Sequence, residues 1–166
     1  MCGIAGYFYS KNLLERINPN LEEANKNLYH RGPDDKGFFY DLDKSLGMTH
    51  SRLAIIDISK AGHQPMVSQD KNYVIIYNGE IYNFRELKSF LNKNASISWQ
   101  SQSDTEVLLN LYVFFRKNKL PIEDFLKKLN GIFSFAIWDN KNKNLFIARD
   151  SFGVKPLYYS LENNGI

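Results

Sequence analysis

A seven-residue run decides the fold of this chain: Ile132-Phe133-Ser134-Phe135-Ala136-Ile137-Trp138. Successive side chains of a strand point to opposite faces of a sheet, and in this run both sets are largely apolar. A strand that is apolar on both faces lies inside a layered structure rather than at its rim. The polar residues 139–143 and the apolar run 145–148 that follow complete a predicted hairpin.

Further from this run, strand patterns gather towards the two ends of the chain and helix patterns lie between them. Strands are predicted over residues 2–9, 37–41, 46–50, 73–77 and 157–159. Helices are predicted from Pro19, over 84–91, from Ser103 and from Pro121. The helix that begins at Ser103-Asp104-Thr105-Glu106 is the longest, and its start has the form of a capping box. This arrangement predicts an α+β fold with sheets packed on each other and helices outside.

The composition is that of an ordinary globular domain. The 166 residues are 43% hydrophobic and 23% charged, which suits a single domain with one core. The net charge of +3 and the lack of a Lys/Arg run give no support for a nucleic-acid or membrane partner. No apolar stretch approaches the roughly 20 residues of a membrane span, and the start does not resemble a signal peptide. One cysteine cannot form an internal disulfide, so we expect a cytoplasmic location.

That single cysteine, Cys2, directly follows the initiator methionine. Methionine is normally trimmed before so small a residue, and the mature chain would then carry a thiol and a free α-amine on one carbon. The reference pKa values of the two groups are about 8.5 and 8, so the amine is well matched to accept the thiol proton. Cys2 is therefore a candidate N-terminal nucleophile. The alternative is a small hydrophobic residue without a chemical role.

Asn78-Gly79-Glu80 follows a predicted buried strand. Glycine allows a backbone N–H to approach a substrate closely, and the neighbouring asparagine amide offers a second donor. Two such donors on a rigid strand would form an oxyanion hole for acyl transfer. The alternative is a tight hairpin turn, because Asn-Gly is common there. The next segment is predicted to be helical rather than a partner strand, which weakens that alternative.

Arg52 and Asp104 together would suit a free amino acid as ligand. Arginine can bind a carboxylate through two parallel hydrogen bonds, and a carboxylate can bind an ammonium group. Asp104 has a purely structural alternative, since acidic residues at helix N-termini are stabilising without any ligand. The three histidines have no metal-ligand spacing, and no phosphate-binding glycine loop is present, so no metal site is expected.

Six ordered blocks carry a resemblance to a known family. They are Met1–Gly6, His30–Asp34, Ser51–Asp57, Asn78–Asn83, Ser103–Glu106 and Arg149–Leu157. Together they resemble the class II glutamine amidotransferase domain of glutamine-hydrolysing asparagine synthetases, over nearly the whole chain. The resemblance implies a four-layer αββα fold of the N-terminal-nucleophile hydrolase type, with two antiparallel sheets between helical layers. It also implies hydrolysis of L-glutamine to glutamate and ammonia.

The resemblance assigns roles to eight residues. Cys2 attacks the glutamine amide, while Asn78 and the backbone of Gly79 hold the oxyanion. Arg52 binds the glutamine carboxylate and Asp104 binds the α-amino group. Ile55, Ile56, Asn78, Gly79 and Glu80 line the glutamine pocket. The residues Arg31 and Asp34 and the segment Arg149–Pro156 are expected to be scaffold, with a part in a pocket wall or a domain interface as the alternative.

In that family a second, C-terminal domain uses ATP and Mg²⁺, whereas the glutaminase domain needs no cofactor. This chain has no pyrophosphatase loop of the Ser-Gly-Gly-Leu-Asp-Ser type and ends where a relative would continue, so residues 1–166 are expected to be the N-terminal fragment of a longer synthetase. The ammonia acceptor stays open between aspartate and a sugar or polysaccharide carboxylate. A non-catalytic domain that kept the fold is a further alternative. The oligomeric state is also open, with a homodimer as one candidate.

Overall fold

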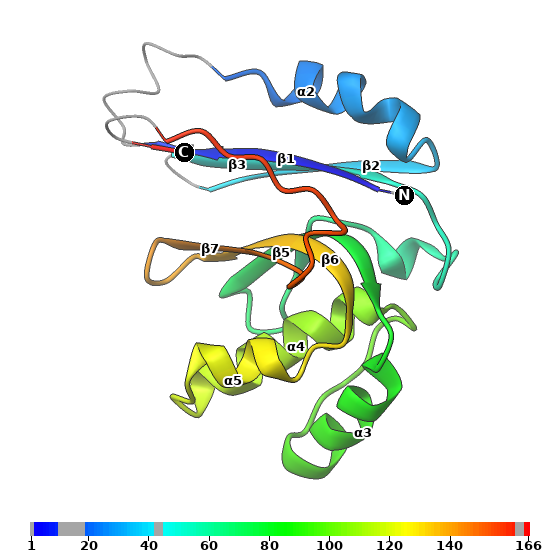
Figure 1. The fold of residues 1–166 in the computed structure, drawn as a ribbon, viewed down its shortest axis with the longest axis vertical. Helices are drawn as coiled ribbons and strands as arrows, with labels where there is room; N and C mark the ends of the chain where they lie inside the picture. The colour runs from blue at the N-terminus through cyan, green and yellow to red at the C-terminus, as the bar shows by residue number, and fades with distance from the viewer. Residues whose placement is uncertain (1, 10–18, 42–44, 162–164) are drawn as a thin grey trace.

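The computed structural model describes residues 2–9, 19–41, 45–161 and 165–166. Two antiparallel sheets lie face to face (Figure 1). The smaller sheet has the strand order β1 (Gly3–Phe8), β3 (Leu46–Arg52), β2 (Asp35–Tyr40). The larger has the order β4 (Met66–Val67), β5 (Tyr73–Ile81), β6 (Gly131–Asp139), β7 (Asn144–Arg149).

Helices cover the outer face of each sheet (Figure 1). The helix α2 (Leu21–Leu28), followed by the 3₁₀ turn η1 (Tyr29–Arg31), packs on β1 and β3. On the far side lie α3 (Phe84–Asn94), α4 (Asp104–Lys117) and α5 (Ile122–Lys127). A second 3₁₀ turn, η2 (Lys60–Gly62), lies between β3 and β4 in the chain. The predicted order of layers, helix, sheet, sheet, helix, is therefore confirmed.

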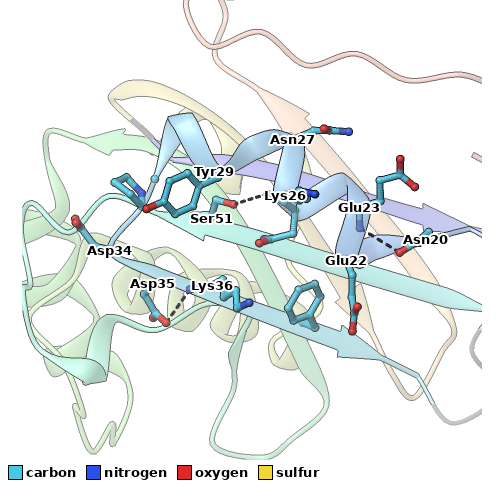
Figure 2. A pocket seen from close by; sticks show the side chains of 14 residues that line it. Asn20, Glu22, Glu23, Lys26, Asn27, Tyr29, Asp34, Asp35, Lys36 and Ser51 are labelled. Carbon is cyan, nitrogen blue, oxygen red and sulfur yellow. Dashed lines mark hydrogen bonds between the residues drawn. The ribbon is translucent and has the colours of Figure 1, made fainter.

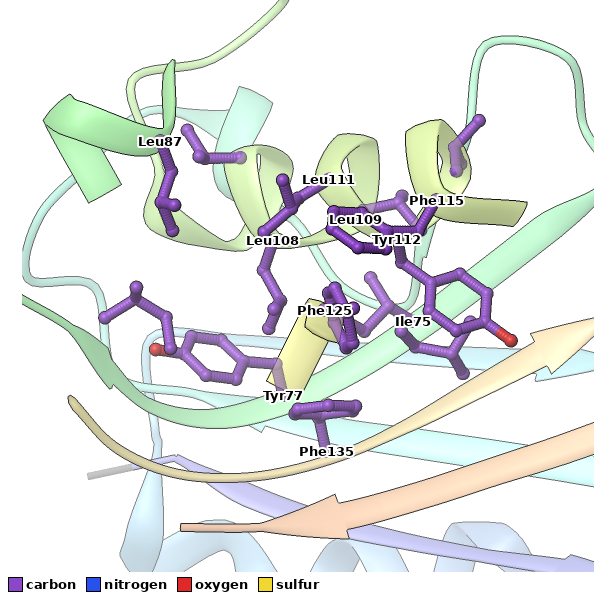
Figure 3. Close-up of a cluster of buried hydrophobic side chains, with 14 of the residues drawn as sticks. Ile75, Tyr77, Leu87, Leu108, Leu109, Leu111, Tyr112, Phe115, Phe125 and Phe135 are labelled. Atoms are coloured by element: carbon purple, nitrogen blue, oxygen red, sulfur yellow. The ribbon is translucent and has the colours of Figure 1, made fainter. Parts of the chain in front are cut away.

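Strand β6 is buried on both faces, as its sequence predicts. Phe133, Phe135 and Ile137 belong to the core cluster between the larger sheet and the helices, which Figure 3 shows beneath α4. Ala136 and Trp138, on the alternate positions, belong to a second cluster between the two sheets. Each large apolar side chain buried in this way contributes about 1.5–3 kcal/mol. The alternation of β6 thus holds together three of the four layers.

The predicted end of the central strand at Asn78-Gly79 is wrong, and so is the hairpin alternative. Strand β5 continues to Ile81 and pairs with β6 along its whole length, up to Ile81 opposite Gly131. Asn and Gly are poor strand formers, but pairing with a buried neighbour outweighs such local preferences. Gly79 also makes room for that neighbour, because a Cβ there would lie 2.7 Å from the Cα of Phe133.

The predicted strand over Leu157–Tyr159 is also wrong. The segment belongs to no sheet, and the side chains of Tyr158 and Tyr159 are exposed. Pairing beside β1 is made instead by the last residues of the chain, where Ile166 and Phe8 exchange two backbone hydrogen bonds of 2.8 Å. Among the residues described, no helix combines the length and the apolar character that crossing a membrane requires.

Candidate active site

A cavity of about 120 Å³ gathers residues from six separate parts of the chain. They come from the residue before β1, the end of β3 with the loop that follows, strand β5, the start of α4, the start of β6 and the segment after β7. All eight residues predicted for the site line it: Cys2, Arg52, Ile55, Ile56, Asn78, Gly79, Glu80 and Asp104. Residues that lie far apart in the sequence are therefore brought into one small space.

Cys2 lies at the edge of the smaller sheet, next to Leu53. The backbone N–H of Leu53 donates to the sulfur at 3.4 Å, and the thiol lies 3.7 Å from the Leu53 carbonyl oxygen. Burial raises the pKa of the Cys2 thiol, while the Leu53 hydrogen bond and the positive charge of Arg52 act in the opposite direction. The thiol is therefore protonated at neutral pH and needs a base to become a nucleophile. Met1, whose removal the sequence predicts, lies outside the described residues.

Successive backbone N–H groups of β5 point to opposite edges of the strand, and this alternation sets the direction of the Gly79 N–H. Both the N–H and the C=O of Phe133, the partner of Gly79 on β6, hydrogen-bond to Asp150. Gly79 and Phe133 are therefore a non-hydrogen-bonded pair of the antiparallel ladder, and the Gly79 N–H points away from β6. The N–H groups of Tyr77 and Ile81 share this direction and bond to Gln64 and Asp104.

Strand β4 ends its pairing with β5 at Ile75, so it does not cover this edge of Gly79. The Gly79 N–H thus faces the open edge of the strand that borders the cavity. Asn78, the preceding residue, is 6% exposed and lines the same cavity. A backbone donor and a side-chain amide donor are consequently neighbours in the wall of one pocket.

Arg52 ends β3 and is buried, at 7% exposure. Its Nη1 donates to the carbonyl oxygen of Ser59 at 2.8 Å, and its Nη2 donates to the carbonyl of Asp57. Gly62 leaves room for the guanidinium, since a Cβ at this position would lie 2.9 Å from Cζ. The two hydrogen bonds use two of the five N–H donors. The loop thus orients a buried cation and leaves it donors for an anion.

Asp57 stabilises the loop that holds Arg52. Its carboxylate accepts hydrogen bonds from the side chain and backbone of Ser59 and from the backbone of Gln102. These bonds, with that of the Ser59 side chain the strongest, lower the pKa of Asp57. Ile55 and Ile56, in the same loop, are 69% and 38% exposed and lie at the mouth of the cavity. Glu80 is exposed on its rim.

Asp104 is the first residue of α4 and is 5% exposed. The hydroxyl of Tyr77 donates to its Oδ2 at 2.7 Å, and the N–H of Ile81 donates to the same oxygen at 3.0 Å. Burial raises the pKa of Asp104, and these two hydrogen bonds oppose the rise. A buried carboxylate with neutral donors on one oxygen is suited to bind a cation.

Sequence reasoning assigned no role to Gln64 and Tyr77, which also line the cavity, and it considered Lys155 only as part of the segment Arg149–Pro156. The amide of Gln64 accepts from the Tyr77 N–H at 2.7 Å and donates to the Thr105 hydroxyl at 3.2 Å, which connects β5 to α4. Gln64 lies in a loop, where no periodic pattern signals its role. Lys155 is buried, and its backbone N–H bonds to the carboxylate of Asp150.

The segment after β7 is organised around Asp150. Its carboxylate accepts backbone hydrogen bonds from Phe133, Phe152, Val154 and Lys155. These bonds keep the pKa of Asp150 below its ordinary value although burial acts against them. The arrangement agrees with the scaffold role expected for this segment.

A larger cavity of about 930 Å³ lies between α2 and β2 (Figure 2). Side chains of both charges line it, among them Glu22, Lys26 and Lys36. None of the eight predicted site residues lines this cavity, and neither does a nucleophile with a neighbouring base. The smaller cavity is therefore the candidate active site. Within the described ranges, no group of three or more His, Cys, Asp or Glu side chains is placed to hold a metal ion.

Comparison with known proteins agrees with the geometry of the smaller cavity. The family described as the glutamine amidotransferase domain matches residues 1–166. The chain belongs to this family. Several proteins that this chain resembles in sequence are far longer than it is.

Three relatives of this amidotransferase domain carry the name glutamine-hydrolysing asparagine synthetase. Asparagine synthetase 1 of Bacillus subtilis is 39% identical and covers 100% of this chain, and asparagine synthetase B of Escherichia coli is 36% identical and covers 99%. A Methanocaldococcus jannaschii protein, provisionally named asparagine synthetase 2, is 42% identical over 99% of the chain. The amidotransferase domain spans only 25%, 28% and 33% of these three relatives, respectively.

A solved structure shows the same fold. The glutamine phosphoribosylpyrophosphate amidotransferase of Bacillus subtilis superposes with a TM-score of 0.74 over 99% of this chain and 40% of that one, at 22% identity. The amidotransferase domain therefore shares the fold of that solved structure, in agreement with the four-layer αββα arrangement that the sequence resemblance implies.

Proposed function

We propose that this chain hydrolyses L-glutamine to glutamate and ammonia, with Cys2 as the nucleophile. The observation that carries the proposal is that one small cavity holds the only thiol of the chain, two adjacent donors on β5, a buried cation and a buried carboxylate. These are the groups that acyl transfer from an amino-acid side chain requires. Membership of the glutamine amidotransferase family supports the same reaction.

The reaction begins with a proton transfer at Cys2. Its α-amine, free once Met1 has been removed, takes the thiol proton, and the sulfur attacks the side-chain amide carbon of glutamine. This step needs a base because burial keeps the thiol protonated. The negative charge that develops on the amide oxygen is stabilised by the Asn78 amide and the Gly79 N–H. The ammonium form of the amine then returns its proton to the departing nitrogen, and ammonia leaves.

The thioester that remains is cleaved by water. The α-amine again acts as the base, this time for the attacking water, and the Cys2 thiol is restored as glutamate leaves. Recognition of the substrate uses the opposite charges of the cavity. Arg52 binds the α-carboxylate and Asp104 binds the α-ammonium group. Ile55, Ile56 and Glu80 form the mouth through which glutamine enters.

The proposal for the ammonia extends beyond this chain. The relatives are three to four times longer, and we propose that this chain is the N-terminal domain of a protein that adds ammonia to aspartate. The further domain would bind ATP and Mg²⁺ to activate the acceptor carboxylate. With a single cysteine and no disulfide, a cytoplasmic location fits this role.

The experiment that tests the reaction compares the processed protein with Cys2→Ala. The wild-type protein is expected to release ammonia from L-glutamine and to gain one adduct from an electrophilic glutamine analogue, measured by intact mass. Cys2→Ala is expected to lose turnover by about 10⁴-fold or more and to gain no adduct, with an unchanged far-UV circular dichroism spectrum.

Two controls sharpen this comparison. An excess of L-glutamine is expected to protect Cys2 from the analogue, because both occupy one cavity. The wild-type protein with Met1 retained is expected to be inactive, because the amine of Cys2 is then an amide. Turnover retained by Cys2→Ala would refute the mechanism, and a processed wild type without turnover or adduct would favour a non-catalytic domain.

A further inference from the structure

Tyr77 forms hydrogen bonds through its backbone N–H, its backbone carbonyl and its side-chain hydroxyl. Its backbone N–H donates to Gln64 Oε1 at 2.7 Å, and its carbonyl oxygen lies 3.1 Å from the Nε2 of the buried His50. Its hydroxyl donates to Asp104 Oδ2 at 2.7 Å. Three hydrogen bonds, to a loop, a strand and a helix, therefore fix one residue next to Asn78.

The side chain of Tyr77 has two parts with separate surroundings. Its ring belongs to the apolar cluster between the larger sheet and the helices. Figure 3 shows the ring at the edge of this cluster, with the hydroxyl pointing away from Phe125 and Phe135. A phenylalanine would fill the same space in the core. The hydroxyl is thus the part that the packing of the cluster does not explain.

What the hydroxyl contacts is the carboxylate of Asp104. The bonds from Tyr77 and Ile81 both end on Oδ2, so neither takes up Oδ1. A carboxylate with one oxygen fixed by two donors has little rotational freedom left. Burial and the negative charge of Asp104 hold the pKa of Tyr77 well above its ordinary value, so the hydroxyl stays a donor at any pH of interest.

We propose that Tyr77 is a positioning residue for glutamine binding: its hydroxyl fixes Oδ2 of Asp104 so that Oδ1 meets the α-ammonium group of the substrate. The inference rests on the proposed function and adds a residue to it. Gln64 supports the arrangement by joining the backbone of Tyr77 to Thr105, the neighbour of Asp104 on α4. The backbone of the donor and that of the acceptor are thereby fixed relative to each other.

The variant Tyr77→Phe, made in the full-length protein with Met1 removed, tests this role. A hydrogen bond to a charged group is worth enough to raise KM for glutamine about ten- to hundredfold, with kcat within about twofold. Loss of the donor also removes the largest of the hydrogen-bond contributions that oppose the effect of burial on the pKa of Asp104, so the acid limb of kcat/KM is expected to move to higher pH. The control Tyr73→Phe removes a hydroxyl from the same face of β5. It is expected to change neither KM for glutamine nor the acid limb of kcat/KM.

Several ionisable groups line the cavity, and each of them can contribute to the pH profile of kcat/KM. Besides Tyr77 and Asp104 these are Cys2, Arg52, Asp57, Glu80 and Lys155. A double-mutant cycle assigns the shift to the pair. Once Asp104→Asn has removed the charge, adding Tyr77→Phe is expected to raise KM by less than about threefold. Independent and fully multiplicative effects of the two substitutions would overturn the inference.

Binding without turnover separates this inference from the proposed function. In the Cys2→Ala background, Tyr77→Phe is expected to weaken L-glutamine binding, measured by calorimetry, by the same factor as KM. If the wild type turns over glutamine but neither KM nor Kd changes in Tyr77→Phe, the positioning role is wrong and the proposed function stands. A processed wild type that neither binds nor hydrolyses glutamine overturns both.

Discussion

Asp104 shows how one residue serves structure and function at once. As the first residue of α4 it has the favourable position of an acid at a helix N-terminus. It is nevertheless buried, and burial raises its pKa, so the folded protein disfavours its charged form. A charge retained against this penalty is expected to have a use in binding.

We predict that Asp104→Asn weakens glutamine binding and does not lower stability at neutral pH. Because the pKa of Asp104 is raised in the folded protein, its ionisation lowers the free energy of unfolding. This loss is absent below pH of about 3.8, where the carboxyl is protonated in both states, and it is complete once pH has risen through the folded-state pKa. Asparagine removes this loss, so Tm at pH 7 should stay equal or rise. KM should rise by the equivalent of about 2–5 kcal/mol, because a charged partner is lost. Thermal unfolding and steady-state kinetics measure the two effects.

Asp124→Asn is the matched control for this prediction. Asp124 also lies in the first turn of a helix, but its carboxylate is exposed and pairs with Lys127 on the surface. Its replacement should change neither KM nor, by more than a few tenths of a kcal/mol, stability. An Asp104→Asn protein that binds glutamine normally would show that this carboxylate is only a helix-start residue.

The start of α4 is the element on which the site depends most. Ser103 caps the helix, with its Oγ accepting from the N–H of Glu106 at 3.2 Å, as the capping-box pattern predicts. The reciprocal bond expected from Glu106 is absent among the described contacts, because its carboxylate accepts from Gln100 and Ser101 instead. The helix start and the segment before it are therefore fixed together.

We predict that Ser103→Ala lowers stability by about 1 kcal/mol and also raises KM for glutamine. The cap lies directly before Asp104, so fraying of the first turn displaces the carboxylate that we propose as the partner of the ammonium group. Urea unfolding gives the first quantity and glutaminase kinetics the second. The control Ser89→Ala lies within α3, where the hydroxyl bonds only to Arg85 of its own helix, and it should leave both unchanged. Equal kinetic effects of the two variants would contradict this prediction.

At the scale of the molecule, His50 connects the two sheets. It lies on β3 of the smaller sheet, is fully buried and bonds through Nε2 to the carbonyl of Tyr77 on β5 of the larger sheet. A carbonyl accepts only, so Nε2 carries the proton of the neutral ring. Burial lowers the pKa of His50 to about 4. The contact between the sheets thus contains a neutral imidazole.

We predict that the protein loses stability as pH falls from 6.5 to about 4, partly through His50. In this window the unfolded chain takes up a proton at the histidine, whose ordinary pKa is 6.5, while the folded chain does not. The stability contribution is complete above pH 6.5, and its loss amounts to about 3 kcal/mol. Urea titrations at pH 7.0 and 4.5 measure it. His50→Gln should reduce this difference, whereas His30→Gln, at an exposed histidine, should not. An undiminished pH dependence in His50→Gln would refute the assignment.

Much of the fold and of the candidate site could be predicted from the sequence. The apolar pattern of Ile132–Trp138 can be recognised from neighbouring residues alone. It predicts a strand between two layers, because a strand with apolar side chains on both faces is stable only when both faces are covered. Cys2, Arg52 and Asp104 each have side-chain chemistry that by itself indicates a role. The family blocks then predicted that they share one site.

Only the tertiary structure decided which strands pair and which side chains share hydrogen bonds. Strand β5 runs through Asn78-Gly79 because β6 lies beside it, and the last residues of the chain, rather than the predicted strand Leu157–Tyr159, pair beside β1. The bond from Tyr77 to Asp104 joins residues 27 positions apart. Local sequence sets which side chains prefer burial and which segments form helices or strands. The partners of a strand edge, a hydroxyl or a carboxylate depend on contacts between distant segments, and those form only when the layers pack.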